Sequence, residues 1–182
     1  MNRTVSTRRN NRGFTLVELC AGIAVCAAVV GQAVPAMSQM RQEQLLRASA
    51  ETLASDLRFA RSEAARTSDS VYFRISGKGA NACYVLHTGA RNDCDCAGGQ
   101  AVCKTATSTV IKAEWLPSSQ PVRLRSNAET LEFQHRQGLV TQTGSIDLSL
   151  DKGTGIRQVV AITGRARTCY TGTKLAGMSK CA

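Results

Sequence analysis

The most informative part of the chain reads Arg12-Gly13-Phe14-Thr15-Leu16-Val17-Glu18-Leu19. It opens an apolar segment, Phe14 to Val34, that carries one charge in 21 residues. As a helix this segment would be about 31 Å long, enough to cross a hydrocarbon core of about 30 Å. Residues 1–13 contain four arginines and no acid, a bias that holds the N-terminus in the cytoplasm.

The small residue Gly13 lies before the apolar segment, whereas a secretory signal places its small-residue cleavage site after it. Cleavage after Gly13 would therefore leave the apolar segment on the mature protein. This N-terminal segment resembles the type III signal of type IV pilins and pseudopilins. The resemblance implies that a prepilin peptidase cleaves between Gly13 and Phe14 and that Phe14 is N-methylated. The alternative is an ordinary signal anchor with a chance glutamate. The matching residues are Gly13, Phe14, Thr15, Leu16, Glu18 and Leu19.

Glu18 is a carboxylate within an apolar segment, where a charge costs on the order of 2.5–3.5 kcal/mol near the bilayer centre. Such a residue is a functional candidate by default. The pilin resemblance implies that Glu18 pairs with the free amine of Phe14 on a neighbouring subunit and guides that subunit into a filament. The alternative is a carboxylate that only extends to the membrane interface.

The charge bias predicts a single pass with the C-terminal domain outside the cytoplasm. The pilin resemblance implies that the membrane is the bacterial inner membrane, that the domain lies in the periplasm, and that the assembled form is a pilus or pseudopilus. Residues 1–13 are the expected leader and 14–34 the transmembrane helix. Residues 35–68 continue this helix, and 69–168 form a β-rich globular domain. Residues 169–182 form a basic tail tied by a disulfide.

Beyond the membrane segment, apolar residues recur at spacings of three and four, which indicates a buried stripe along a helix. Pro35 is a candidate kink, and the polar run 67–70 is expected to end the helix. We therefore expect one helix over about 14–68, with its second half packed on the globular domain. The stripe consists of Leu46, Ala50, Leu53, Leu57, Ala60 and Ala64.

After residue 70, apolar and polar residues alternate, a pattern that predicts β-strands. The fold class is therefore α+β: a long N-terminal α-helix packed on an antiparallel β-sheet domain, as in type IV pilins. The 148 residues that follow position 34 are enough for one domain with a modest core. The expected strands are 71–75, 83–87, 109–115, 121–125, 130–135, 138–142, 145–150 and 156–163.

Three later segments resemble the GspH/FimT group, which comprises the H-type pseudopilins and related minor pilins. Residues 53–64 resemble the helix of that group, 133–138 its late hairpin, and 159–167 its last strand and basic end. The resemblance covers nearly the whole chain and is weakest between residues 90 and 120. It implies that the partners are other pilin or pseudopilin subunits.

The chain has eight cysteines, which divide by position. Cys20 and Cys26 lie in the membrane segment and are interpreted as small apolar side chains. The six outside it are an even number, which favours disulfides in an exported domain. Cys169 and Cys181 bracket a short tail and are the expected pair, and a bridge there would contribute up to about 3 kcal/mol.

The other four external cysteines allow three pairings, and the sequence does not choose among them. Zinc is the rival interpretation. Their spacing lacks the Cys-x2-Cys pairs of common zinc sites, so no metal is expected. The four are Cys83, Cys94, Cys96 and Cys103.

The formal net charge is +10, and loss of the leader leaves about +6. Residues 152–182 contain six bases and no acid, and membrane topology does not explain this excess because the region is expected outside the membrane. In an extended chain Arg165 and Arg167 point to the same side, where their guanidinium groups can bind neighbouring phosphates. The bases are Lys152, Arg157, Arg165, Arg167, Lys174 and Lys180.

The run Gly164-Arg165-Ala166-Arg167 resembles the DNA-binding end of FimT-like minor pilins that serve DNA uptake. The resemblance implies nonspecific binding of double-stranded DNA, with Arg165 and Arg167 as the main contacts and Lys174 and Lys180 as weaker ones. Gly164 would let the backbone turn or approach a ligand. The alternatives are a solvated basic face and a tail that contacts acidic pilus subunits.

No catalytic motif or phosphate-binding loop appears, and neither catalysis nor a cofactor is expected. The two histidines, His87 and His135, are interpreted as structural or exposed. The predicted function is a minor pilin of a type IV pilus that binds DNA in natural transformation. The alternative is an H-type pseudopilin of a type II secretion system without DNA binding. The basic tail favours the first, because the N-terminal signal is common to both.

Overall fold

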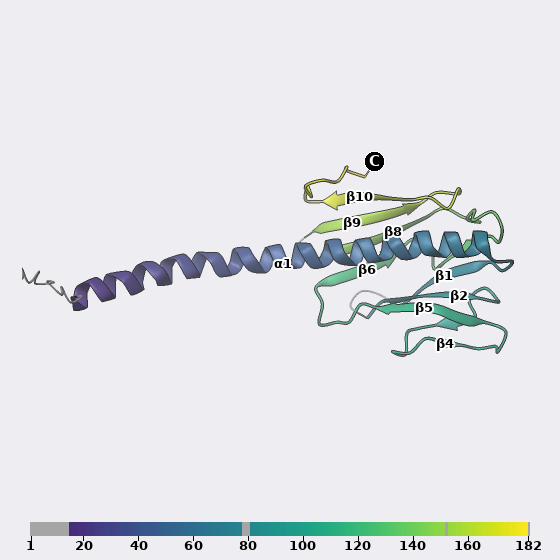
Figure 1. Cartoon of the computed structure of the whole chain (residues 1–182), viewed down its shortest axis with the longest axis horizontal. Helices are drawn as coiled ribbons and strands as arrows, with labels where there is room; N and C mark the ends of the chain where they lie inside the picture. The colour runs from purple at the N-terminus through teal and green to yellow at the C-terminus, as the bar shows by residue number, and fades with distance from the viewer. Residues whose placement is uncertain (1–14, 78–80, 152, 182) are drawn as a thin grey trace, which may run out of the picture. The chain divides into compact units, whose positions relative to one another are not determined.

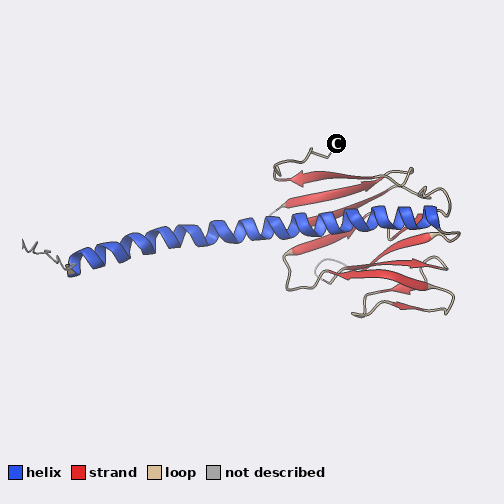
Figure 2. Cartoon of the chain, viewed as in Figure 1, coloured by secondary structure: helices blue, strands red, loops and turns tan. Residues whose placement is uncertain are grey.

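The computed structural model describes residues 15–77, 81–151 and 153–181. In these residues one helix, α1 (Leu16–Arg66), is followed by ten strands (Figures 1 and 2). The chain divides into two compact units, Met1–Met40 and Arg41–Ala182. The strands are β1 Val71–Ser76, β2 Cys83–Thr88, β3 Cys94–Asp95, β4 Val102–Cys103, β5 Thr109–Trp115, β6 Val122–Ser126, β7 Thr130–Phe133, β8 Gly144–Leu150, β9 Thr154–Val160 and β10 Ala166–Gly172.

The described part of the N-terminal unit is the first half of α1. Its large apolar side chains are exposed from Leu16 to Met40. By length and composition α1 could cross a membrane, and none of its most apolar part is buried. The helix continues without interruption through Pro35, the candidate kink. This half of α1 is therefore a candidate membrane anchor.

In the C-terminal unit, α1 packs through one face. All six residues of the predicted stripe are at most 1% exposed, which confirms that prediction. The helix ends at Arg66, two residues before the expected end. The Glu63 carbonyl accepts the N–H of Thr67 (2.9 Å) and also the Thr67 hydroxyl (2.8 Å). Such a local side-chain bond competes with continuation of the helix.

Two four-stranded antiparallel sheets accompany the helix. The first sheet has the strand order β5-β2-β1-β7, and the second has the order β10-β9-β8-β6. Buried and partly exposed residues alternate along all of β8, as predicted for a strand with one solvated face. The inner sides of both sheets share one core with α1. Its largest buried side chains include Phe73, Phe133, Leu86, Ile146 and Leu148.

The observed strands differ from the expected ones at residues 138–142, at the C-terminal end, and in the short strands β3 and β4, which were not expected. Residues 138–142 form no strand, because Arg136 and Gly138 take positive φ values and close a turn that leaves Val140 with a single bridge to Phe133. At the C-terminal end, β10 pairs with β9 and runs to Gly172. The region expected to be a tail from residue 169 therefore begins inside a strand.

Residues 89–108, here called the disulfide lobe, pack on the outer side of the first sheet. The bridges Cys83–Cys96 and Cys94–Cys103 select one of the three pairings left open by the sequence. Strands β3 and β4 form a short hairpin within the lobe. Cys83 and Val85 of β2 form a second, smaller core with Cys94 and Cys96. Strand β2 is consequently buried on both sides.

Polar contacts connect α1 to each sheet. The buried Asp56 carboxylate accepts hydrogen bonds from the Tyr84 hydroxyl (2.7 Å) and from Lys112 Nζ (2.7 Å) of the first sheet. Burial and the hydrogen bond to Asp56 raise the pKa of Tyr84 far above its ordinary value. On the second sheet, the Gln158 side-chain amide donates to the Ala50 carbonyl (3.1 Å). Each contact satisfies polar groups that burial would otherwise leave unpaired.

Candidate functional site

The N-terminal signal lies only partly within the described residues, since Gly13 and Phe14 fall outside them. Thr15 and Glu18 are described, and together they cap the start of α1. The Glu18 N–H donates to the Thr15 hydroxyl (3.3 Å), and the Thr15 N–H donates to the Glu18 carboxylate (3.5 Å). This arrangement is a capping box. Its Thr-x-x-Glu spacing is visible in the sequence but is missing from the predictions above.

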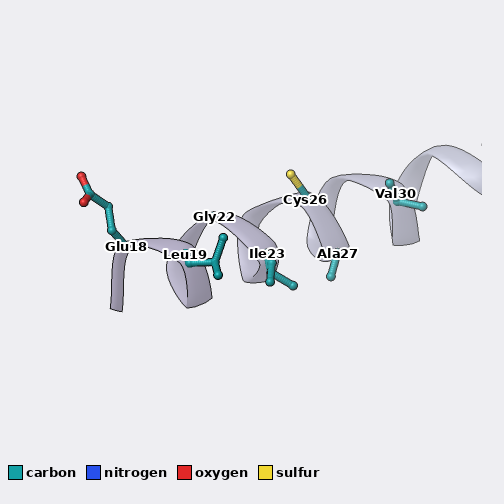
Figure 3. Close-up of a pocket in the computed structure, with 7 residues that line it drawn as sticks. All are labelled: Glu18, Leu19, Gly22, Ile23, Cys26, Ala27 and Val30. Carbon is teal, nitrogen blue, oxygen red and sulfur yellow. The ribbon is translucent and has the colours of Figure 1, made fainter. Parts of the chain in front are cut away.

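Beyond Glu18, one exposed face of α1 is almost entirely apolar, and Figure 3 shows Glu18 extending from its start. A Cβ placed on Gly22 would meet no atom within 4 Å, so the helix surface is open at that point. Cys20 and Cys26 are exposed free thiols. The segment thus offers an apolar surface with one carboxylate at its start. The other residues of this face are Leu19, Gly22, Ile23, Cys26, Ala27 and Val30.

The second sheet carries arginines from three strands on the side that faces away from α1. The strand register places Cys169, Arg157, Asp147 and Arg125 side by side across β10, β9, β8 and β6. Arg167 and Arg123 occupy the adjacent rows, and Arg165 directly precedes β10. The basic sheet face is defined here as Arg123, Arg125, Arg157, Arg165 and Arg167.

Carboxylates neutralise two of these arginines. Arg157 binds Asp147 through two hydrogen bonds, Nε to Oδ1 at 2.6 Å and Nη2 to Oδ2 at 3.0 Å, and this contact raises the pKa of Arg157. Arg123 lies 3.4 Å from a carboxylate oxygen of Asp151. Arg125, Arg165 and Arg167 are exposed and have no carboxylate partner among the described residues. The face therefore has an excess of three positive charges.

The sequence predicted two of these three arginines, Arg165 and Arg167. It did not predict Arg125, although the alternation Arg123-Leu124-Arg125 is the signal that places both arginines on one side of a strand. Nor did it predict that Asp147 neutralises Arg157. That pairing depends on the register between β8 and β9, which the local pattern does not specify.

Gly164 has a structural role in the turn between β9 and β10. It is buried with φ +71, and its N–H donates to the Ala161 carbonyl (2.8 Å). A Cβ at this position would lie 2.1 Å from the Gly138 carbonyl oxygen, so no side chain fits. The expected turn is therefore present. The group that lies close to Gly164 is the Gly138 carbonyl of the same chain, where the sequence offered a ligand as one possibility.

The C-terminal residues are held to the domain at several points. Cys169 bonds to Cys181, the expected pair, and residues 179–181 run beside Tyr170 of β10. Leu175 is buried in the main core, and Arg47 donates to the Ala176 carbonyl (3.0 Å). These contacts keep the segment ordered although it has little apolar periodicity. The remaining predicted DNA-contacting residues, Lys174 and Lys180, are both exposed.

Neither histidine belongs to the basic sheet face. His87 is fully buried on β2 and stacks on Tyr72 with ring centroids 5.3 Å apart, and burial lowers its pKa. His135 is exposed in the loop after β7. No group of three or more metal-ligating side chains occurs in the described part of the chain.

Residues 49–164 match the family model described as "Type II transport protein GspH". This match covers more than half of the sequence. The chain belongs to the GspH family.

Two crystal structures of the type IV minor pilin FimU from Pseudomonas aeruginosa, in space groups P21 and P65, are also similar to the chain. Each is 18% identical, and the TM-scores are 0.48 and 0.46. The first alignment covers 69% of this chain and 88% of FimU, and the second covers 68% and 91%. No curated protein matches the chain.

Membership of the GspH family confirms the resemblance seen in the sequence and agrees with the long helix and antiparallel sheets. A GspH-family chain is a structural protein of the pilin type, and the family implies association with other pilin subunits. The exposed apolar half of α1 agrees with an association with a pilus or a membrane.

Proposed function

We propose that the chain is a minor pilin, made as a precursor in the inner membrane and assembled into a filament. In this proposal a prepilin peptidase cleaves after Gly13 and Phe14 is methylated. Glu18 then exchanges the Thr15 N–H for the amine of Phe14 on a neighbouring subunit. The position of the Glu18 carboxylate supports this role, because it is exposed at the first turn of an otherwise apolar helix. The periplasmic domain has no catalytic role.

The domain's proposed ligand is double-stranded DNA, bound without sequence preference in the course of DNA uptake. The observation that carries this proposal is a set of three exposed arginines on one sheet face that have no carboxylate partner among the described residues: Arg125, Arg165 and Arg167. Guanidinium groups bind phosphate oxygens through paired hydrogen bonds, and each neutralised phosphate releases counterions. Contacts of this kind position a protein on DNA without reading its sequence.

A second candidate is an H-type pseudopilin of a type II secretion system. The description of the matching family, a type II transport protein, favours it. This candidate requires the same processing and assembly but no affinity for DNA. The two candidates therefore differ in the role of the basic sheet face and agree on the N-terminal segment.

DNA binding is tested with the full chain in nonionic detergent and two duplexes of unrelated sequence, by fluorescence anisotropy. We expect a Kd of about 10⁻⁴ to 10⁻⁶ M at physiological salt for both duplexes. Three phosphate contacts give a salt slope of about −3, or about a 40-fold loss of affinity between 50 and 200 mM salt. Replacing Arg165 and Arg167 together with Gln should reduce that slope by about two.

The matched control replaces two exposed cations of the disulfide lobe, Arg91→Gln with Lys104→Gln. It removes the same charge far from the basic sheet face and should leave the slope nearly unchanged. Circular dichroism verifies folding of each variant. No salt-dependent binding by the wild-type chain at high micromolar concentration would favour the secretion pseudopilin instead.

Processing is tested separately by mass spectrometry of protein from a host that has the prepilin peptidase. The mature chain should begin at a methylated Phe14, and a bulky residue in place of Gly13 should block cleavage. Glu18→Ala should be cleaved but should not enter filaments. A mature chain that still begins at Met1 would refute this part of the proposal.

A further inference from the structure

Three segments meet at the end of the domain where α1 terminates (Figure 1). They are the last turns of α1, the loop between β7 and β8, and the turn between β9 and β10. The Arg136 N–H donates to the Ala64 carbonyl of α1 (2.9 Å), and the Val140 N–H donates to the Ile162 carbonyl (2.9 Å). The loop is thereby bonded both to the helix end and to the hairpin.

Two glycines at this junction make room for the side chain of Arg61. A Cβ on Gly138 would lie 3.0 Å from Arg61 Cγ, and a Cβ on Gly164 would lie 3.1 Å from both Cδ and Nε of Arg61. Both glycines have positive φ, at +60 and +71. The stem of Arg61 therefore lies across two tight turns of the backbone, and Arg165 follows the second turn directly.

The junction carries three arginines and no carboxylate paired to them among the described residues: Arg61, Arg136 and Arg165. All three are exposed. A nearby acid on the helix, Glu63, is already bound to Arg66 at 2.6 Å. Arg136 takes φ +63, an uncommon conformation for a residue with a side chain. Like charges on such neighbouring segments repel one another, and a bound anion reduces that repulsion.

We propose that Arg61, Arg136 and Arg165 form a second phosphate-binding site, here called the arginine tip. The inference rests on the proposed DNA function and extends its site beyond the second sheet. Arg165 belongs to both the basic sheet face and the arginine tip. A DNA backbone bound along the face therefore continues over the end of the domain, where Arg61 and Arg136 bind a further phosphate.

A purely structural explanation exists for cations at this end of α1, since they counter the negative end of the helix dipole. That explanation predicts lower stability and unchanged DNA affinity when Arg61 or Arg136 is replaced. The phosphate site predicts the opposite. Affinity and its salt dependence should fall, and the unfolding midpoint should stay close to that of wild type.

The experiment compares the full chain with Arg61→Gln/Arg136→Gln and with the charge-matched control Arg91→Gln/Lys104→Gln. The tip adds one phosphate to the three of the basic sheet face, so its occupation should give a wild-type salt slope of about −4 rather than about −3. For the first variant only, we expect about a tenfold loss of duplex affinity and a slope shallower by about one. Arg61→Lys in place of Arg61→Gln in this double variant should recover part of the salt slope, because lysine restores the charge without the planar fork. A tip variant that binds like the control would overturn the inference while leaving the DNA proposal in place.

A second titration distinguishes failure of the arginine tip from failure of the DNA proposal. The wild-type chain is titrated with inorganic pyrophosphate while the Nε–H signals of the arginines are followed by NMR. Saturable shifts confined to Arg61, Arg136 and Arg165 support the tip even if no duplex binds. If no duplex binds and these signals do not shift, both the DNA function and the tip are refuted.

Discussion

Each of the two sheets has four antiparallel strands, but their outer faces differ in what covers them. On the first sheet the disulfide lobe covers the outer side, and the partly buried Arg74 is bound to Asp95 (3.4 Å) and Glu129 (3.3 Å). On the second sheet Arg125 and Arg167 are exposed without a carboxylate among the described residues. The fold itself can thus pair and cover an arginine. The free arginines of the second sheet are the ones that the DNA proposal assigns to phosphate groups.

The largest effect is expected from removing the cover of the first sheet. Replacing all four lobe cysteines with Ser should cost about 3 kcal/mol per bridge in the chain-entropy model, with less than full additivity because the two loops overlap. Urea unfolding measures the loss. Hydrogen exchange should show β2 losing protection before β8 does.

A matched pair of variants removes one bridge from each sheet. Cys83→Ser with Cys96→Ser opens one loop of the lobe, and Cys169→Ser with Cys181→Ser opens a loop of similar length on the second sheet. The second variant should cost less than removal of the Cys83–Cys96 bridge, because no apolar sheet face becomes uncovered. Equal losses from the two bridges would show that the lobe contributes only chain entropy.

The polar contacts of α1 sharpen the same comparison. Asp56→Ala should destabilise the domain by about 3 kcal/mol, because it leaves the Tyr84 hydroxyl buried without an acceptor and Lys112 without its partner. Gln158→Met keeps the volume and should cost only about 1 kcal/mol. Urea unfolding of both variants gives the ranking, and a larger loss for Gln158→Met would reverse it.

The turn that carries Arg165 gives a smaller and more local effect. Gly164→Ala should cost about 2 kcal/mol, because the residue has positive φ and its Cβ would collide with the Gly138 carbonyl. Gly153→Ala, in the other hairpin of the same sheet, has φ +80 but open space around it and should cost about 1 kcal/mol. Thermal unfolding compares the two variants. Equal shifts would mean that the collision is relieved at no cost.

The smallest effect concerns pH and the buried His87. Because its folded pKa lies below the unfolded value of about 6.5, the unfolded chain binds the extra proton first, and stability falls as the pH drops below about 6.5. The pKa values of Asp93 and Asp95 are also lowered, and their contributions are lost only below about pH 4.

Between pH 7 and 5 the wild-type chain should therefore lose unfolding free energy, because the unfolded chain takes up the proton of His87 first. His87→Phe keeps a ring against Tyr72 and should show a flatter profile in urea unfolding at the same pH values. The second sheet holds no buried histidine within the described residues, so this sensitivity belongs to the first sheet. A variant with the wild-type slope would assign it to another group.

Sequence patterns predicted the parts of the fold that depend on local periodicity. The stripe from Leu46 to Ala64 is buried as predicted, and the alternation in β8 matches its exposure. The prediction failed at residues 138–142, where two positive φ values close a turn that composition alone does not distinguish from a strand. The expected strand 156–163 also ends later than β9, and no strand was expected over the whole of β10, because apolar residues continue into the turn that Gly164 closes.

By itself, the sequence determined the apolar helix, the register of Gly13, Phe14 and Glu18, the buried stripe and the basic character of the C-terminal region. These features depend on residue type and short spacing, which a linear chain displays directly. Only the tertiary structure decided how the lobe cysteines pair, which arginines form ion pairs with Asp147 and Asp151, and why Gly164 cannot carry a side chain. Those outcomes depend on strand register and on contacts between distant segments, such as Arg61 with Gly138 and Gly164, and short-range patterns do not encode them.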